Sequence, residues 1–183
     1  TYGGVAMTQA GRIANGKRVA EIWYLNNPAS GAQTVAGTLS VKISNMRAAI
    51  TYTGAVAGTP VGVFASAIGT SAASTVDVAS VADDMVVDAQ SDSAGEATRT
   101  VGAGQTERSD LSRGGSSTEP ATGTTTTMSW TITNDIWAIG GVAIKAGAAG
   151  PAPTTEYGLH AIHRGAVAGI NTGARMGGWL EYS

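Results

Sequence analysis

Residues 124–133 read TTTTMSWTIT, and apolar and small polar side chains alternate along the second half of this stretch. Met128, Trp130 and Ile132 fall on one side of an extended chain, and the intervening serine and threonines fall on the other. A strand with one buried and one solvated face has this period of two, whereas a helix repeats about every 3.6 residues. The same alternation recurs between turn residues over residues 1–145, which predicts an all-β domain.

The predicted strands are separated by glycine, proline, asparagine, aspartate and serine, the residues that tight turns favour. No amphipathic segment of helical length lies between them, which argues against a βαβ fold. We therefore predict an antiparallel β-sandwich of jelly-roll type. The predicted strands are residues 2–7, 18–25, 34–44, 47–53, 61–67, 74–78, 85–89, 105–111, 124–133 and 137–145.

Three of these strands and one loop are predicted in more detail. Residues 18–25 (RVAEIWYL) carry apolar side chains on both faces, so we place this strand in the centre of a sheet. Residues 124–133 and 137–145 are predicted to form a hairpin across residues 134–136. Residues 112–123 (SRGGSSTEPATG) are predicted to form a loop.

The last predicted strand contains a change of apolar register. Ile139 and Val142 are three residues apart and would lie on opposite faces of a regular strand. Gly140 and Gly141 lie between them, where a β-bulge would absorb the change. We therefore predict a bulge at these two glycines.

Composition excludes several classes of protein. The 183 residues are enough for one domain with a sizeable core. The formal net charge is −2 and the eleven basic residues are scattered, whereas a phosphate-binding surface needs clustered lysine and arginine, so we expect no nucleic-acid partner. Cysteine is absent, which excludes disulfides and thiolate metal sites. No run of about 18 apolar residues occurs, and we expect no membrane span.

The chain changes character after residue 145. Residues 146–153 (AGAAGPAP) are small and contain proline, which predicts a linker. Residues 154–183 form a C-terminal segment in which Thr154 or Thr155 is expected to cap a short helix, weakened by three glycines.

The end of this C-terminal segment carries several large apolar residues but too few for a core of its own. We expect the segment to dock on the domain of its own chain or of a neighbour. The candidates for this assembly contact are Met176, Trp179, Leu180 and Tyr182.

Several strings of strand residues together look familiar: 5–8 (VAMT), 18–25 (RVAEIWYL), 104–108 (GQTER), 128–130 (MSW) and 137–145 (WAIGGVAIK). They resemble β-sandwich modules that recur in large secreted bacterial proteins and in phage structural proteins, as spacers, decorations or adhesive units. The resemblance spans residues 1–145, implies a fold rather than a reaction and carries no catalytic residue. It also implies a further strand or two before Tyr2. Because the sequence opens at Thr1 without a methionine and a strand is predicted from Tyr2 onward, we expect a processed or truncated start.

Two groups of residues are candidates for binding a metal. His160 and His163 lie three residues apart on the predicted helix, but a closed site needs about four ligands and only Glu156 is near. The second group is acidic and could offer oxygen ligands to calcium, although its spacing matches no EF-hand. We interpret the histidines as polar residues at a subunit or domain contact and the acidic group as solvated strand ends and turns, and we predict no metal or other cofactor. The acidic group comprises Asp77, Asp83, Asp84, Asp88, Asp92 and Glu96.

The residues that could support catalysis do not converge on one site. Glu107 and Arg108 would point to opposite faces of a strand, and no second carboxylate follows at a glycosidase spacing. No Gly-x-Ser-x-Gly elbow occurs. The tryptophans Trp23, Trp130 and Trp137 are expected in the core. We therefore predict that the chain is not an enzyme.

The sequence favours a structural or decoration subunit of an extracellular or virion assembly, such as a phage particle, a surface fibre or an appendage. Its partners would be copies of itself or other structural subunits at the cell surface or in a virion. The alternative is a carbohydrate-binding or adhesive module of a secreted protein that recognises surface glycans. Residues 90–101 and 112–123 contain no tryptophan or tyrosine, which disfavours this alternative.

Overall fold

The computed structural model describes residues 1–38, 46–93, 99–147 and 156–164. These residues form strands and no helix, as the alternating pattern predicts. No helix that could cross a bilayer is found in this part of the chain. The strands are β1 (Thr8–Asn15), β2 (Arg18–Asn26), β3 (Met46–Thr53), β4 (Ala65–Ala79), β5 (Met85–Asp92), β6 (Thr100–Val101), β7 (Thr106–Leu111), β8 (Gly114–Pro120), β9 (Thr125–Ile144) and β10 (Glu156–Arg164).

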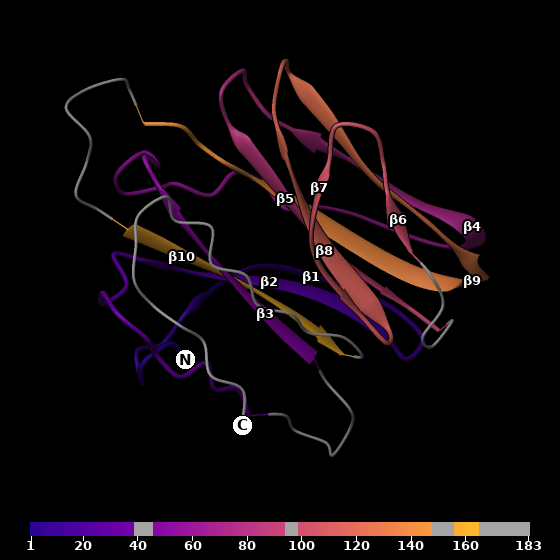
Figure 1. Cartoon of the computed structure of the whole chain (residues 1–183), viewed down its shortest axis with the longest axis horizontal. Helices are drawn as coiled ribbons and strands as arrows, with labels where there is room; N and C mark the ends of the chain where they lie inside the picture. The colour runs from indigo at the N-terminus through magenta and orange to yellow at the C-terminus, as the bar shows by residue number, and fades with distance from the viewer. Residues whose placement is uncertain (39–45, 94–98, 148–155, 165–183) are drawn as a thin grey trace.

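The strands pair antiparallel in two sheets, which Figure 1 shows at the lower left and the upper right. The four-stranded sheet has the order β1-β2-β10-β3, so β10 lies between two strands from the first third of the chain. The six-stranded sheet has the order β4-β9-β5-β8-β7, and β6 also pairs with β9. The central position predicted for strand 18–25 is confirmed, because β2 pairs with β1 and with β10.

The first hydrophobic core lies between the two sheets. Ala20 and Ile22 of β2 are fully buried, and they pack in one cluster with residues of β5 and β9. Phe64 also packs here, between the two sheets, because a Cβ added to Gly11 of β1 or to Gly140 of β9 would collide with its ring. This cluster comprises Ala20, Ile22, Ile50, Ala55, Val87, Ala89, Val142 and Ile144.

A second core lies on the other face of the six-stranded sheet, which folds over on itself. The β4–β9 register shifts where Ser71 and Ala73 of β4 face Asp135 and Thr131 of β9, so β9 holds extra residues at this point. Such an irregularity bends a paired ribbon. The bend brings both parts of the 20-residue β9 onto one cluster: Val76, Val78, Val86, Ala121, Met128, Trp130, Ile132, Trp137, Ile139 and Ala143.

The segment of β9 that follows the bend is buried on both faces. Ile139 belongs to the second core and Val142 to the first, and both are fully buried. The two glycines between them allow close packing on each side: Gly140 lies against Phe64, and a Cβ on Gly141 would be 2.6 Å from Val78 Cγ2. Each pairs in unbroken register with β4 and β5.

The predictions for this region were therefore wrong in two respects. No hairpin crosses residues 134–136, because β9 runs through them as one strand paired with β4. No bulge occurs at Gly140 and Gly141 either. The apolar register changes because both faces of the sheet are covered, which removes the simple alternation on which the prediction relied.

Other strand predictions are corrected in their boundaries. Strands 61–67 and 74–78 belong to one 15-residue strand, β4, which begins at Ala65, while Val61 makes only an isolated bridge with Ile144. Strand 2–7 is reduced to isolated bridges of Tyr2 with Val5 and Val35. The predicted strand 34–44 keeps only that bridge at Val35, and residues 39–45 lie outside the described part.

Three elements longer than two residues were missed or assigned to another class. The strand β1 was not predicted, and the predicted loop 112–123 contains β8. Both strands are rich in small and polar residues, so their hydrophobic signal is weak. The predicted helix after Thr154 is instead the strand β10. Pairing with β2 and β3 satisfies its backbone on both sides, which overrides a local helix propensity already weakened by glycine.

Candidate functional site

A fully buried carboxyl group, that of Asp88, lies in the six-stranded sheet. Its two oxygens accept hydrogen bonds from different strands: the Trp130 Nε1–H of β9 donates to Oδ2 at 2.7 Å, and the Ser117 backbone N–H of β8 donates to Oδ1 at 2.7 Å. Asp88 and Trp130 are respectively 0% and 1% exposed. Asp88 on β5 therefore links its own strand to two others.

The surroundings of Asp88 change its acidity. Burial disfavours the charged form and raises the pKa of Asp88 to about 7, against the opposing effect of the hydrogen bonds from Trp130 and Ser117. A carboxyl group that titrates near pH 7 is a common feature of catalytic acids and bases. The Asp88 carboxyl group has no exposed surface, and the contacts described above are with residues of its own sheet.

A buried ion pair occupies the end of β5. Arg99 donates to both carboxylate oxygens of Asp92, from Nε at 2.6 Å and from Nη2 at 3.0 Å. The side chains of Arg99 and Asp92 are 1% and 0% exposed. Arg99 also donates through Nη1 to Asp110 Oδ1 at 2.7 Å and to the Leu111 carbonyl at 2.8 Å, both at the end of β7. This guanidinium joins β5 to the edge strand β7.

Two further side chains connect β7, β8 and β9. The Gln105 side chain accepts the backbone N–H of Ser129 at 2.8 Å and donates to Ser117 Oγ at 2.7 Å. Arg108 lies where the β7–β8 register shifts, and its Nε donates to Thr118 Oγ1 at 2.8 Å. The predicted strand 105–111 is thus confirmed as β7, with Arg108 bridging to the neighbouring strand.

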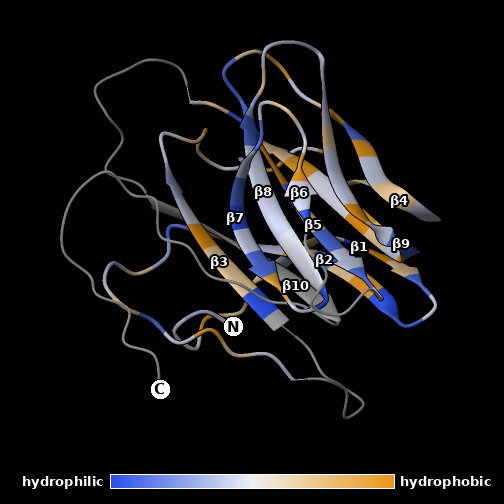
Figure 2. Ribbon diagram, turned by 45° about the vertical axis from the view of Figure 1, so that its right-hand side comes forward, coloured by the Kyte–Doolittle hydropathy of each residue, from blue (hydrophilic) through white to orange (hydrophobic). Residues whose placement is uncertain are grey.

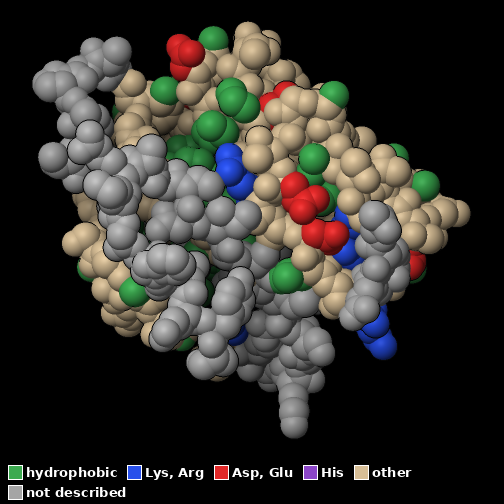
Figure 3. Space-filling model, in the orientation of Figure 1, with side chains coloured by type: hydrophobic (Ala, Val, Ile, Leu, Met, Phe, Trp, Pro, Cys, Tyr) green, Lys and Arg blue, Asp and Glu red, His purple; other side chains and the backbone are tan. Residues whose placement is uncertain are grey.

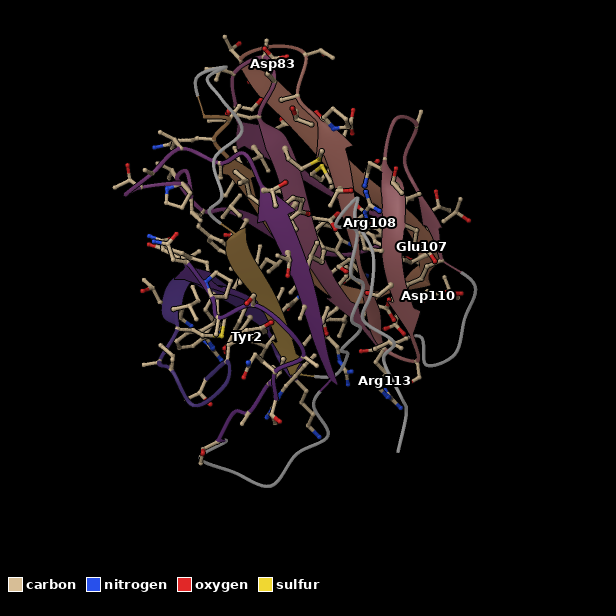
Figure 4. All side chains as sticks on the ribbon, turned by 60° about the vertical axis from the view of Figure 1, so that its left-hand side comes forward. Tyr2, Asp83, Glu107, Arg108, Asp110 and Arg113 are labelled. Carbon is tan, nitrogen blue, oxygen red and sulfur yellow. The ribbon has the colours of Figure 1, made fainter. Side chains whose placement is uncertain are left out.

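The charged residues of β7, labelled in Figure 4, differ in exposure. Arg108 is half-buried, whereas Glu107 and Asp110 are exposed. Burial and the nearby charge of Asp110 raise the pKa of Glu107, against the opposing effect of Arg99. Figure 3 shows a face whose described surface is mostly uncharged, with a few acidic and basic side chains near its centre.

Tyr52 of β3 lies opposite this region and packs against the first core. Its hydroxyl is buried and has no hydrogen-bond partner among the described residues. Burial raises the pKa of Tyr52; the charge of Arg108 lowers it and that of Asp88 raises it further. The phenol therefore stays neutral at physiological pH, as a packing group.

The acidic residues considered for calcium have separate partners in the structure and do not form one site among the described residues. Asp77 accepts from Thr127 Oγ1, and Asp84 accepts the backbone N–H groups of Val81 and Ala146. Asp84, Asp88 and Asp92 are buried, so their interpretation as solvated strand ends was wrong. The described residues contain no group of three or more potential metal ligands, and Glu96 lies outside them.

The candidates in the C-terminal segment fall largely beyond the described residues. His160 and His163 lie on β10, so the helix on which their spacing was considered is not formed. The docking candidates Met176, Trp179, Leu180 and Tyr182 lie outside the described residues, and their role stays a prediction.

The tryptophans differ in burial. Trp130 and Trp137 are 1% and 6% exposed, as predicted for core residues. Trp137 lies against Gly69, its partner across the β4–β9 pair, and donates to Ser71 Oγ at 3.0 Å. Trp23 is only half-buried, and its Nε1–H donates to Glu21 Oε2 at 3.1 Å.

Comparison with protein-family models, with curated proteins and with solved structures finds no match for this chain.

Sequence reasoning missed the contacts that join the strands. Asp92 was considered only as a member of the acidic group and Arg99 was given no role, although the two form a buried bidentate pair. One signal was present: Val86, Asp88, Gln90 and Asp92 alternate along β5 with Val87 and Ala89, and both sets are buried. Carboxylates inside a strand that is buried on both faces need partners in the core.

Proposed function

We propose that this chain is a non-enzymatic structural or decoration module of an extracellular or virion assembly, built on an antiparallel sandwich of jelly-roll type. The observation that carries the proposal is the use of the buried ionisable groups. Asp88 joins β5 to β8 and β9, and Arg99 joins Asp92 of β5 to the end of β7. Such contacts resist the sliding and separation of strands, which a load-bearing module must withstand.

The surface adds support to a structural role over an adhesive one. The large apolar side chains that are exposed in the described part are valines and isoleucines: Val5, Val63, Ile68, Val81 and Ile136. Aliphatic side chains suit contacts between protein subunits, whereas sugar rings are usually bound on aromatic side chains.

Negative-stain electron microscopy of the purified full-length chain, together with sedimentation velocity, tests the proposal. We expect regular particles, rings or filaments, and species much heavier than the 18.2 kDa chain. Monomers alone over the whole accessible concentration range would contradict an assembly role. Glycan-array binding by such monomers would favour the adhesive alternative instead.

A further inference from the structure

The first half of β4, residues 65–71, is an open sheet edge. Within the described chain, β4 pairs only with β9, so every second residue directs its backbone N–H and C=O away from the sheet. This half reads ASAIGTS and contains no charge and no proline. Figures 1 and 2 both show β4 at the outer border of the six-stranded sheet.

The other edge strands are different. Charged side chains on an edge strand discourage pairing with another chain. β1 carries Arg12 and β3 carries Arg47, while β7 carries Glu107, Arg108 and Asp110. In Figure 2 β7 is strongly hydrophilic, whereas β4 is pale with apolar bands. The first half of β4 therefore lacks a protection that β1, β3 and β7 have.

Exposed apolar side chains border this edge. Ile68 is 50% exposed and Ile136 of β9 is 41% exposed. Ile68 faces Ala138 and Thr70 faces Ile136 in the β4–β9 register, so the two isoleucines are diagonal neighbours. Val63, just before β4, is 81% exposed. The open backbone groups and an apolar patch thus occur at the same place.

We propose that this edge binds a second copy of the chain by antiparallel pairing of β4 with β4 about a two-fold axis at Ile68. The inference rests on the proposed function and names the partner for that assembly. An edge that pairs with itself about a two-fold axis presents matching donors and acceptors to its copy. The axis places the two Ile68 side chains against each other and sets Ser66 of each chain opposite Thr70 of the other.

The charges and the shape of β4 favour a copy of the chain as the occupant. No charge lies in residues 65–71, so two copies meet without like-charge repulsion. The one charged residue of β4, Asp77, falls nine positions beyond Ile68 and does not face its copy in this register. The β4–β9 irregularity after Ser71 bends the edge and limits the continuous pairing to the first half.

Substitution of the residue on the axis tests this inference. Ile68→Lys places two like charges at the two-fold axis on a side chain that is already half exposed, so the monomer should keep its fold. Val81→Lys is the matched control, because Val81 is 60% exposed and lies outside β4. By sedimentation velocity on the full-length chain, we expect wild type and Val81→Lys to form dimers of twice 18.2 kDa or assemblies built from them. Ile68→Lys should lose this dimer contact while its melting temperature stays close to that of wild type.

A cysteine probe gives a direct readout of the register. The chain has no cysteine, so Ile68→Cys provides a single thiol. Facing residues in an antiparallel pair have Cα atoms about 4.5–5.5 Å apart, within the range that a disulfide spans. Mild oxidation should cross-link Ile68→Cys into covalent dimers and leave Val81→Cys mostly monomeric. Equal cross-linking of both variants, or none at Ile68→Cys, would overturn the inference.

Electron microscopy separates this inference from the proposed function. Assemblies that persist unchanged in Ile68→Lys would overturn the β4 contact and leave the structural role standing. A β4-linked dimer that forms no larger assembly would support the contact and contradict the structural role. A wild-type chain that remains monomeric at all concentrations would overturn both.

Discussion

The six-stranded sheet contains a fully buried ion pair, whereas the ion pair of the four-stranded sheet lies near the surface. Arg99 and Asp92 are 1% and 0% exposed in the first sheet, while Arg12 and Glu21 are 41% and 10% exposed in the second. An exposed pair contributes about 0–1 kcal/mol, because water screens it. A buried charge that loses its partner costs several times more.

The two sheets also differ in how the chain builds them. The strands of the six-stranded sheet all lie between Ala65 and Ile144. The long strand β9 runs through both parts of this bent sheet and pairs with β4 on either side of the bend. The four-stranded sheet combines β1, β2 and β3 with β10, which follows more than a hundred residues later. We therefore expect the six-stranded sheet to be the last part of the molecule to unfold and the four-stranded sheet to be the first.

The largest effect is expected for Trp130→Ala. The change removes a fully buried side chain from the second core, which costs about 3–5 kcal/mol, and it also removes the indole donor of Asp88. Chemical denaturation should show a domain that is close to unfolded at room temperature. Trp23→Ala, at a half-buried position of the four-stranded sheet, is the control and should cost clearly less. Equal losses would mean that the two sheets do not differ in stability.

The next effect compares the two ion pairs. Arg99→Met leaves the Asp92 carboxylate buried without its guanidinium, and we expect a loss of about 3–5 kcal/mol. Arg12→Met removes the surface partner of Glu21 and should cost less than about 1 kcal/mol. Denaturant midpoints of both variants, measured at equal ionic strength, decide the matter. A small loss for Arg99→Met would show that Asp92 finds other partners or water.

The sequence predicts residues 124–133 of the six-stranded sheet most clearly, because their apolar residues alternate strongly, and it also places strands within β4, β5 and β7. Met128, Trp130 and Ile132 are core residues, as their period of two indicates. The exceptions have a physical reason. β8 consists of glycine, serine, threonine and glutamate before its proline, yet its backbone pairs on both sides, so burial there does not depend on apolar side chains.

Long-range pairing is the part that the sequence does not reveal. Nothing in the local sequence of residues 156–164 indicates that this segment pairs with β2 on one side and β3 on the other. A helix was therefore predicted for this segment. In the same way, Asp88 and Trp130 are 42 residues apart, and only the folded sheet brings them together. The buried carboxylates of β5 could have been recognised as core residues, but their partners could not have been named.

A pair of truncations tests the weaker sheet. Removing residues 154–183 deletes β10, whereas removing residues 165–183 keeps β10 and deletes the docking candidates. Loss of an inner strand removes ladder hydrogen bonds worth about 1 kcal/mol each, mainly in the four-stranded sheet. We expect hydrogen exchange to show reduced protection in β2 and β3 for the longer deletion, with β5 and β9 still protected.

The shorter deletion is the matched control for this comparison. It should leave the protection of β2 and β3 unchanged if β10 alone completes the sheet. If both deletions reduce protection equally, the docking candidates contribute to stability within the chain. If neither deletion changes protection, β10 does not support the sheet in solution.

The smallest effect concerns the charge state of Asp88. Burial raises its pKa in the folded state to about 7, whereas the unfolded chain has a value of about 4. The folded state therefore binds the proton more tightly, so the stability that this group contributes is fully present below about pH 4 and is lost as the pH rises through about 7. Between pH 6 and pH 8 we expect a decrease of about 1 kcal/mol in the free energy of unfolding. Asp88→Asn removes the titration and should flatten this dependence.

The Asp88→Asn variant loses one hydrogen bond, because Trp130 and the Ser117 backbone both donate and the amide can accept with only one oxygen. Denaturant unfolding of both proteins at several pH values measures the difference, and an equal slope in wild type and Asp88→Asn would assign the pH dependence to other groups.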